Sequence, residues 1–305
     1  MKKLSLLLIF NIIILTALVG CKKNDYYCSG EDVFITDNDV YVVGNICEGS
    51  SITDVPTLWI NGEPQSVGQM GNFNRASSVF VDGDDIYVTV TEREQGKAFL
   101  WKNGIVELLG TQEVNSVFVE NGNVYVAGQN NGKPTLWTNG IPTYLSDSPG
   151  SAKTVYVSEQ DVYVTGYSGD YFAGTATVWK NGDEIQLSSQ RSHANDICIV
   201  DNKIYIVGEE NNNAVLWING KIQVLSSDKS VAYSISVSNN NIYVSGIGGF
   251  DPVGRPVYGV WKNGIRQFIS NEMRDEIKAV KINNDKVYLS GSSVNKIPLW
   301  IADIN

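Results

Sequence analysis

Six copies of the motif Trp-x-Asn-Gly run through this chain of 305 residues and constrain its fold more than any other feature. The motif tryptophans are Trp59, Trp101, Trp137, Trp179, Trp217 and Trp261, and a seventh, Trp300, lacks the Asn-Gly. They lie 36 to 44 residues apart, and each follows a short apolar segment centred on a tyrosine, at Tyr41, Tyr87, Tyr125, Tyr163, Tyr205, Tyr243 and Tyr288. The chain is therefore one supersecondary unit written seven times.

The second repeat shows how each unit folds. Residues 78–81 are a short apolar run, 82–85 are turn residues, 86–88 are a second apolar run, and 99–101 lead to a third strand at Trp101. Asn103-Gly104 then predicts a type I′ hairpin turn into a fourth strand at 105–109, because Asn tolerates and Gly permits the positive φ that this turn needs. Helical periodicity is missing. Short four-stranded units at a period near forty predict an all-β fold, a seven-bladed β-propeller over residues 26–305 with four antiparallel strands per blade.

Three features of the repeats give expectations about packing. The tryptophans and tyrosines are expected to act as wedges between blades. A glycine three residues past six of the tyrosines indicates a bulge or a close backbone approach, with Val90 as the exception. The last repeat ends before a fourth strand, and residues 26–28 stand spare before the first, so we expect an N-terminal strand to complete the last blade and close the ring.

The N-terminus predicts export and lipidation. Residues 1–20 form a secretory signal with two lysines, an apolar run and small residues before Cys21, which is the expected lipidation site, followed by a tether over 21–25. An ordinary signal peptide is the alternative. The mature chain would carry 33 acidic and 21 basic residues, a surface that repels nucleic acid, so the lipid is the expected membrane contact. Lys22 does not resemble an inner-membrane retention aspartate, which favours the outer membrane of a bacterial cell envelope.

The remaining cysteines have different expectations. Cys28 and Cys47 lie close together in an exported chain, and a disulfide between them is left open. Cys198, between two isoleucines, is expected to be a small buried hydrophobe.

The repeats resemble kelch-type propeller repeats. The resemblance rests on second strands such as Val40-Tyr41-Val42-Val43-Gly44 and on Leu-Trp-Lys-Asn-Gly endings, and it departs from kelch in having one glycine rather than a pair. The chain is more similar to bacterial lipoproteins of uncharacterised function built from tandem Tyr-Val-x-Gly and Trp-Lys-Asn-Gly repeats. The resemblance implies a propeller and no activity.

Few residues point to catalysis, and we expect no metal site and no cofactor. The single histidine, His193, is expected to be a solvent-facing loop residue, and the turn at 82–85 lacks calcium-site spacing. Carboxylates before or within the first strands offer an alternative, an envelope glycan hydrolase or lyase that uses acids at the channel mouth. The acids are Glu31, Asp32, Asp196, Asp228, Glu272 and Asp275. However, the positions nine before each tyrosine are mostly small hydrogen-bonding residues, which favours a structural ring.

Loop length gives the strongest functional signal. The loops between the second and third strands are extended in repeats one, four and six, and insertions into a repeat scaffold tend to carry binding residues. The candidate ligand-binding residues in repeats four and six are Tyr167, Asp170, Tyr171, Phe172, Phe250, Asp251, Arg255 and Tyr258. The alternative is that these rings only fold their own loops. The sequence thus predicts a lipid-anchored binding or assembly platform for a protein or glycan partner, and an enzyme is the less favoured class.

Overall fold

The computed structural model describes residues 27–47, 54–67, 74–227, 229–267, 276–294 and 299–303. Within these ranges the chain forms 27 β-strands and no helix, so there is no helix that could span a lipid bilayer in this part of the chain. The predicted signal peptide (1–20), the lipidation site Cys21 and the tether (21–25) lie outside the described residues.

The strands follow the seven repeats. The first repeat holds β1 (Tyr27–Ile35), β2 (Val40–Cys47), β3 (Asp54–Ile60) and β4 (Glu63–Ser66). The second holds β5 (Asn74–Asp82), β6 (Asp85–Glu92), β7 (Lys97–Lys102) and β8 (Ile105–Thr111). The third holds β9 (Glu113–Glu120), β10 (Asn123–Asn130), β11 (Lys133–Thr138) and β12 (Ile141–Tyr144). The fourth holds β13 (Gly150–Ser158), β14 (Asp161–Ser168), β15 (Thr175–Lys180) and β16 (Asp183–Gln186). The fifth holds β17 (Ser192–Val200), β18 (Lys203–Glu210), β19 (Asn213–Ile218) and β20 (Lys221–Ser226). The sixth holds β21 (Val231–Ser238), β22 (Asn241–Phe250), β23 (Pro256–Lys262) and β24 (Ile265–Gln267). The seventh holds β25 (Glu276–Asn283), β26 (Lys286–Val294) and β27 (Leu299–Asp303).

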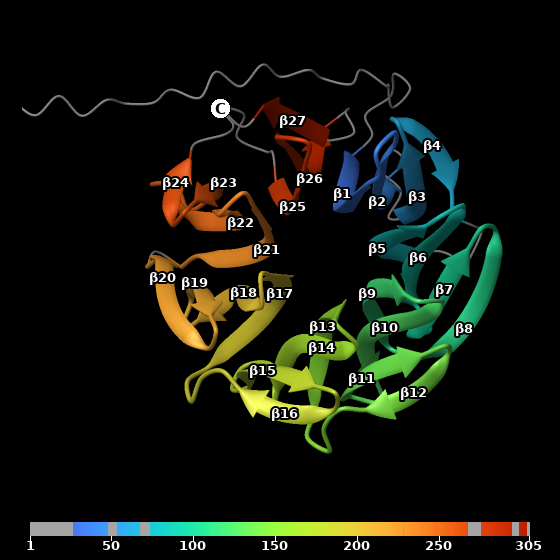
Figure 1. The fold of residues 1–305 in the computed structure, drawn as a ribbon, viewed down its shortest axis with the longest axis horizontal. Helices are drawn as coiled ribbons and strands as arrows, with labels where there is room; N and C mark the ends of the chain where they lie inside the picture. Colours follow the sequence, from blue (N-terminus) through green and yellow to red (C-terminus); the bar gives the residue numbers. More distant parts are fainter. Residues whose placement is uncertain are drawn as a thin grey trace, which may run out of the picture.

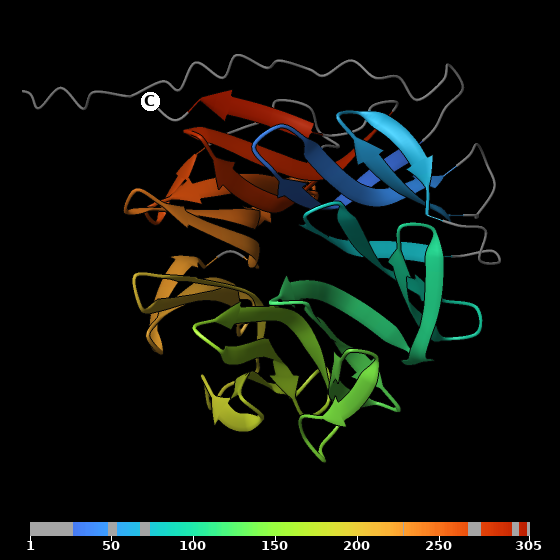
Figure 2. The same ribbon diagram turned by 45° about the vertical axis from the view of Figure 1, so that its right-hand side comes forward.

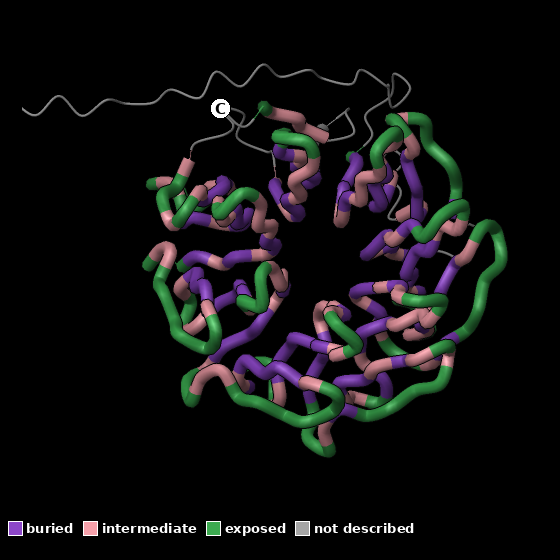
Figure 3. Tube along the Cα trace, in the orientation of Figure 1, coloured by how far each residue is buried: buried purple, intermediate pink, exposed green. Residues whose placement is uncertain are grey.

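The sheets are arranged radially. Repeats two to six each form a separate four-stranded antiparallel sheet, whereas repeats one and seven share a seven-stranded sheet of order β25-β26-β1-β2-β3-β4, with β27 also paired to β26. The sheets surround a central space with the first strand of each repeat innermost (Figure 1; Figure 2 shows the same ring turned by 45°). Exposed residues gather on the outer strands and turns (Figure 3). The architecture is an all-β propeller.

All six Asn-Gly turns have the predicted geometry. Both residues of each pair have positive φ, for example 52° at Asn181 and 91° at Gly182. The asparagine side chain adds two contacts that the turn type alone does not require. In repeat four its oxygen accepts from Val162 N of the second strand at 2.9 Å, and its amide donates to Oδ1 of Asp161, the first residue of that strand, at 2.8 Å. Asparagine therefore ties the third strand to the hairpin of the first and second strands.

The recurring glycine marks a bulge, as predicted. In repeat five the register between β17 and β18 shifts between Ala194 and Asp196, where Gly208 passes the bulged strand. A Cβ added to Gly208 would lie 1.9 Å from the carbonyl oxygen of His193, far closer than real Cβ contacts. Five other repeats place a glycine at the same bulge, and Val90 of repeat two, which faces Ala76, is the exception there too.

The predicted packing of tryptophan and tyrosine side chains between neighbouring repeats is confirmed. Seven hydrophobic clusters among the described residues each combine side chains of two consecutive repeats, including repeats seven and one. At a typical junction Tyr163 of repeat four and Trp217 of repeat five share one cluster. Trp59, Trp137, Trp179, Trp217 and Trp261 are each at most 1% exposed.

The two ends of the described chain meet in a manner that differs from the prediction. Tyr27 and Cys28 do not form a separate outer strand beside β27; they begin β1, the innermost strand of repeat one. Their backbone pairs with Val294 and Ser293 at the end of β26 while also pairing with β2. Tyr27 and Cys28 therefore bridge two repeats, and among the described strands β27 pairs with β26 alone.

The disulfide left open between Cys28 and Cys47 is not formed. Cys47 is a free thiol that lies 2.6 Å from Asp54 Oδ1. On the paired strands β1 and β2, Cys28 faces Ile46 and Cys47 faces Tyr27. Because successive side chains of a strand project to opposite faces, the two cysteines point to opposite sides of the sheet, and no disulfide geometry joins them without a register shift.

Candidate functional site

The first strands of the repeats line a central cavity of ≈ 930 Å³. We divide its wall into three levels along those strands. The loop-side level lies toward the loops between the second and third strands and comprises Glu31, Ser77, Asn115, Lys153, Asn195, Tyr233 and Lys278. The middle level comprises Asp32, Ser78, Ser116, Thr154, Asp196, Ser234 and Ala279. The turn-side level lies toward the turns between the first and second strands and comprises Phe34, Phe80, Phe118, Tyr156, Cys198, Ser236 and Lys281.

The middle level is the structural ring that the spacing predicts. Ser78 Oγ donates to Asp32 Oδ2 at 2.9 Å and accepts from the backbone N–H of Val117 in the following repeat at 3.4 Å. Ser116 and Ser234 accept from the next repeat in the same way, and Thr154 donates to the carbonyl of Asn195. These side chains satisfy buried backbone groups and link neighbouring sheets.

The two aspartates of this level occupy junctions where the middle-level residue of the preceding repeat, Ala279 or Thr154, accepts no backbone N–H from the aspartate's own repeat. Ala279 has no polar side-chain atom, and Asp32 accepts the N–H of its own neighbour Val33 through Oδ1 at 2.8 Å. Asp196 does the same for Ile197 at 2.8 Å. The Oδ2 atoms of both aspartates then link to the next repeat.

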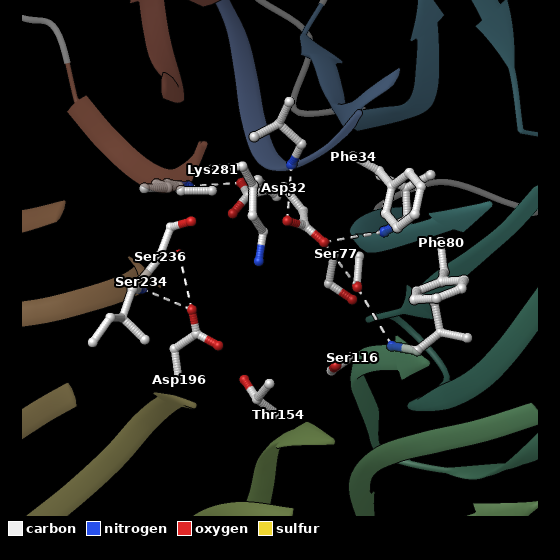
Figure 4. A pocket seen from close by; sticks show the side chains of 18 of the residues that line it. Asp32, Phe34, Ser77, Phe80, Ser116, Thr154, Asp196, Ser234, Ser236 and Lys281 are labelled. Carbon is white, nitrogen blue, oxygen red and sulfur yellow. Dashed lines mark hydrogen bonds and ion pairs between the residues drawn. The ribbon is translucent and has the colours of Figure 1, made fainter. Parts of the chain in front are cut away.

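The described carboxylates that a glycan hydrolase or lyase would need in the cavity wall are therefore already hydrogen-bonded within the protein. Asp32 and Asp196 each accept three hydrogen bonds at 3.2 Å or less (Figure 4). Burial raises the pKa of Asp32. Asp228, Glu272 and Asp275 lie outside the described residues.

The loop-side level is crossed by ion pairs. Glu31 is flanked by Lys278 of repeat seven and Arg75 of repeat two, each at 2.6 Å. Burial opposes ionisation of Glu31, but the two cations prevail and hold its pKa below the ordinary value. Lys153 pairs with Glu113 at 3.2 Å, and that pairing, against a similar burial cost, also lowers the pKa of Glu113. The mouth is charged but locally balanced.

His193 is not the solvent-facing loop residue expected from the sequence. It lies in β17 and is 5% exposed. One ring nitrogen lies 3.0 Å from the carbonyl oxygen of Tyr171 and the other 3.2 Å from Glu209 Oε1, and its ring contacts Tyr167 and Tyr171 with centroids 4.4 and 4.9 Å apart. The imidazole thus anchors the loop of repeat four to the mouth of the cavity.

The candidate ligand-binding residues of repeat four form two sets, one that supports the loop and one that is exposed on its surface. Tyr167 is buried in β14, and Asp170 accepts backbone N–H groups of its own loop, such as that of Phe172 at 2.9 Å. Tyr171 and Phe172 are 52% and 78% exposed and pack edge to face, with ring centroids 5.3 Å apart.

Repeat six divides in the same way. Asp251 accepts from the N–H groups of Val253 and Arg255 and from the Arg255 guanidinium at 2.9 Å, so the charged pair folds its own loop. Phe250 is 46% exposed. Burial, with Glu276 nearby, raises the pKa of the half-buried Tyr258 to about 12.

Tyr233 of the loop-side level lies within electrostatic range of both loops, through Tyr171 of repeat four and Tyr258 of repeat six. Burial raises the pKa of Tyr233, and Tyr258, Glu276, Glu209 and Tyr171 add to the effect. Tyr233 was not among the candidate residues because this position varies without a pattern and is Glu, Ser, Asn, Lys, Asn and Lys in the other repeats. No group of three or more His, Cys, Asp or Glu residues within the described ranges is arranged to hold a metal ion.

Sequence reasoning also missed the turn-side level. Phe34, Phe80, Phe118 and Tyr156 form a continuous arc with ring centroids 4.8 to 5.1 Å apart. Lys281 stands at the equivalent position of repeat seven, within the otherwise apolar run 279–282. A lysine where four other repeats place an aromatic ring was the available signal.

No family model and no curated protein sequence matches this chain. Among solved structures it is similar to the β-propeller domain of the Trilobed protease from Pyrococcus furiosus, which has an open velcro topology (TM-score 0.56, 14% identity, 93% of this chain and 97% of that one). It is also similar to the Pyrococcus horikoshii acylaminoacyl peptidase (TM-score 0.55, 14% identity), covering 92% of this chain and 52% of the peptidase. A third similar structure is Chaetomium thermophilum Sqt1 bound to the N-terminus of the ribosomal protein L10 (TM-score 0.51, 9% identity, 90% and 87% covered). At these identities the similarity shows the propeller fold alone.

Proposed function

We propose that this chain is a binding or assembly platform of the bacterial cell envelope, lipid-anchored through Cys21 in the outer membrane, whose loop face holds a protein or glycan partner. The observation that carries the binding function is the exposed pair of Tyr171 and Phe172. The loop beneath the pair is held by Asp170 and His193, so the two rings are presented with little conformational freedom to lose on binding. Rigid exposed aromatics are the usual anchors of binding surfaces.

The proposal includes a ring closed between repeats seven and one, which makes the platform rigid. Three contacts support it: the pairing of β1 with β26, the ion pair of Lys278 with Glu31, and the hydrogen bond from Asn283 to the carbonyl of Thr36 at 3.2 Å. The kelch-like repeat and the likeness to repeat-built bacterial lipoproteins are part of this proposal and rest on the sequence motifs.

Binding is favoured over glycan hydrolysis or lysis. The described aspartates of the cavity wall link sheets, and a carboxylate that accepts three hydrogen bonds is poorly placed to exchange protons with a substrate. The Sqt1 propeller, which holds the N-terminus of a ribosomal protein, is a precedent within this fold for a polypeptide partner.

The test is affinity capture from native envelopes with Tyr171→Ala/Phe172→Ala. The matched control is Ile141→Ala/Ile265→Ala, which removes apolar side chains of similar exposure, 70% and 69%, from the outer strands β12 and β24. Proteins are identified by mass spectrometry and glycans on an array. We expect the loop variant to lose a captured species that the control keeps. Equal capture by the two variants contradicts the site.

Anchoring is tested separately. We expect Cys21→Ser to abolish incorporation of labelled palmitate and to release the protein from the outer-membrane fraction of a density gradient. Unchanged labelling and fractionation of the variant contradict the lipid anchor.

A further inference from the structure

The turn-side level of the cavity breaks the near-symmetry of the repeats. Tryptophan, tyrosine and glycine recur in almost every repeat, but here repeats one to four contribute aromatic rings, repeats five and six contribute Cys198 and Ser236, and repeat seven contributes Lys281. The small side chains leave space opposite the rings. A ring-shaped scaffold has no structural need for such a one-sided wall.

The aromatic arc, Phe34-Phe80-Phe118-Tyr156, presents apolar surface to this space. Its members are half-buried, and all four line the cavity. Contiguous apolar surface inside a concave site of about 300–1,000 Å³ is typical of small-molecule pockets. The arc therefore suits an apolar chain or an aromatic ring.

Lys281 supplies the polar group. Its side chain extends into the cavity between Asp32 and Asp196 (Figure 4), and its ammonium makes no ion pair within 4.0 Å and no hydrogen bond to any residue that the structure describes. The two aspartates act on it only at longer range, because their oxygens are already taken by the backbone and serine donors of the middle level. Three N–H donors are thus available beside the aromatic arc.

We propose that this part of the cavity binds a small apolar monocarboxylic acid, with its carboxylate on Lys281 and its hydrocarbon or aromatic part against the arc. A charge-assisted hydrogen bond from an ammonium to a carboxylate is stronger than one to a neutral acceptor. Phosphates and dicarboxylates are disfavoured because each negative charge beyond the one that meets Lys281 adds repulsion from Asp32 and Asp196 without a further cation to offset it. The site is separate from the Tyr171–Phe172 pair and does not depend on the proposed function of the loop face.

The experiment is equilibrium binding of phenylacetate and octanoate to the purified full chain, by titration calorimetry at pH 7, with phenylacetamide as the neutral match. We expect wild type to bind phenylacetate or octanoate, or both, saturably. Where phenylacetate binds, its affinity should exceed that of phenylacetamide. Lys281→Met should weaken acid binding at least about tenfold and amide binding clearly less, since the carboxylate loses an ion-paired hydrogen bond and the amide carbonyl loses only a hydrogen bond to a neutral acceptor. Phe80→Ala should weaken the binding of acid and amide alike.

Controls separate this site from the loop face and from misfolding. Lys281→Arg retains the charge and should keep acid binding within about threefold, while Tyr171→Ala/Phe172→Ala should bind the acids as wild type does. If Lys281→Met fails to fold by circular dichroism, the acid-to-amide preference of wild type and of Lys281→Arg decides. Any one of three results overturns the proposal. Wild type shows no saturable acid binding, wild type binds phenylacetate and its amide with equal affinity, or folded Lys281→Met binds the acids as tightly as wild type.

Discussion

Two buried tryptophans at equivalent positions should respond differently to the same substitution. Trp137 and Trp179 are both 0% exposed and lie in the third strands of repeats three and four. The indole Nε1 of Trp137 donates to the carbonyl oxygen of Leu109 at 2.9 Å. The Nε1 of Trp179 is buried without a hydrogen-bond partner among the described residues. Replacing either by phenylalanine removes the same volume, so the cavity cost largely cancels in the comparison.

The remaining difference is the hydrogen bond. Trp137→Phe leaves the buried carbonyl of Leu109 without its donor, at a cost of about 1–3 kcal/mol, whereas Trp179→Phe removes a donor that was already unsatisfied. We expect Trp137→Phe to be less stable than Trp179→Phe by about 1–3 kcal/mol. Since 1 kcal/mol shifts Tm by about 2–4 °C in proteins of 150–250 residues and by less in longer chains, the Tm values should differ by no more than roughly 12 °C.

The assay is urea unfolding followed by far-UV circular dichroism, which reports chiefly on the loss of the strands and avoids the tryptophan fluorescence that the substitutions alter. Reversibility and equal denaturant dependence in both variants establish that the midpoints can be compared. Equal midpoints, or a lower midpoint for Trp179→Phe, would refute the assignment of the energy difference to the indole N–H. Trp137→Ala should cost more than either phenylalanine variant, about 3–5 kcal/mol.

Three further predictions concern the turns, the bulges and the mouth. Asn181→Asp should destabilise the protein more than Asn181→Gly, because it places a second carboxylate against Asp161, and the excess loss, measured as urea midpoints, should shrink at pH 3. Gly208→Ala should lower stability by about 1–3 kcal/mol or more in a thermal melt, because the added Cβ meets a backbone oxygen at 1.9 Å; an unchanged Tm would contradict the close approach. The pKa of Glu31 is lowered in the folded state. The stability that its ion pairs contribute is therefore present above its ordinary pKa of 4.5 and is lost as the pH falls through the folded-state pKa. Glu31→Gln should make the urea midpoint less dependent on pH in this acid range, and a pH profile identical to that of wild type would contradict the prediction.

Much of the candidate site could not be derived from the sequence because it depends on burial and on register. The loops of repeats four and six are recognisable by length, but the structure decides that Tyr167 and Asp170 support the loop while Tyr171 and Phe172 face outward. His193 shows the same limit. It follows a polar loop in the sequence, yet the bulged start of β17 turns it into a buried contact of that loop.

The sequence by itself determined what local conformation controls. Each Asn-Gly pair sets a turn through its dihedral preferences, and each recurring glycine marks a bulge. The spacing of Trp and Tyr gives the sheets two apolar faces, and the repeats bury those faces by stacking against one another around an axis. Tertiary structure alone decided how the ends meet at β1 and β26, on which faces Cys28 and Cys47 lie, and that Lys281 lines the same cavity as an arc of rings from four other repeats. Those features join residues far apart in the chain, and only the assembled ring sets the distances and the exclusion of water between them.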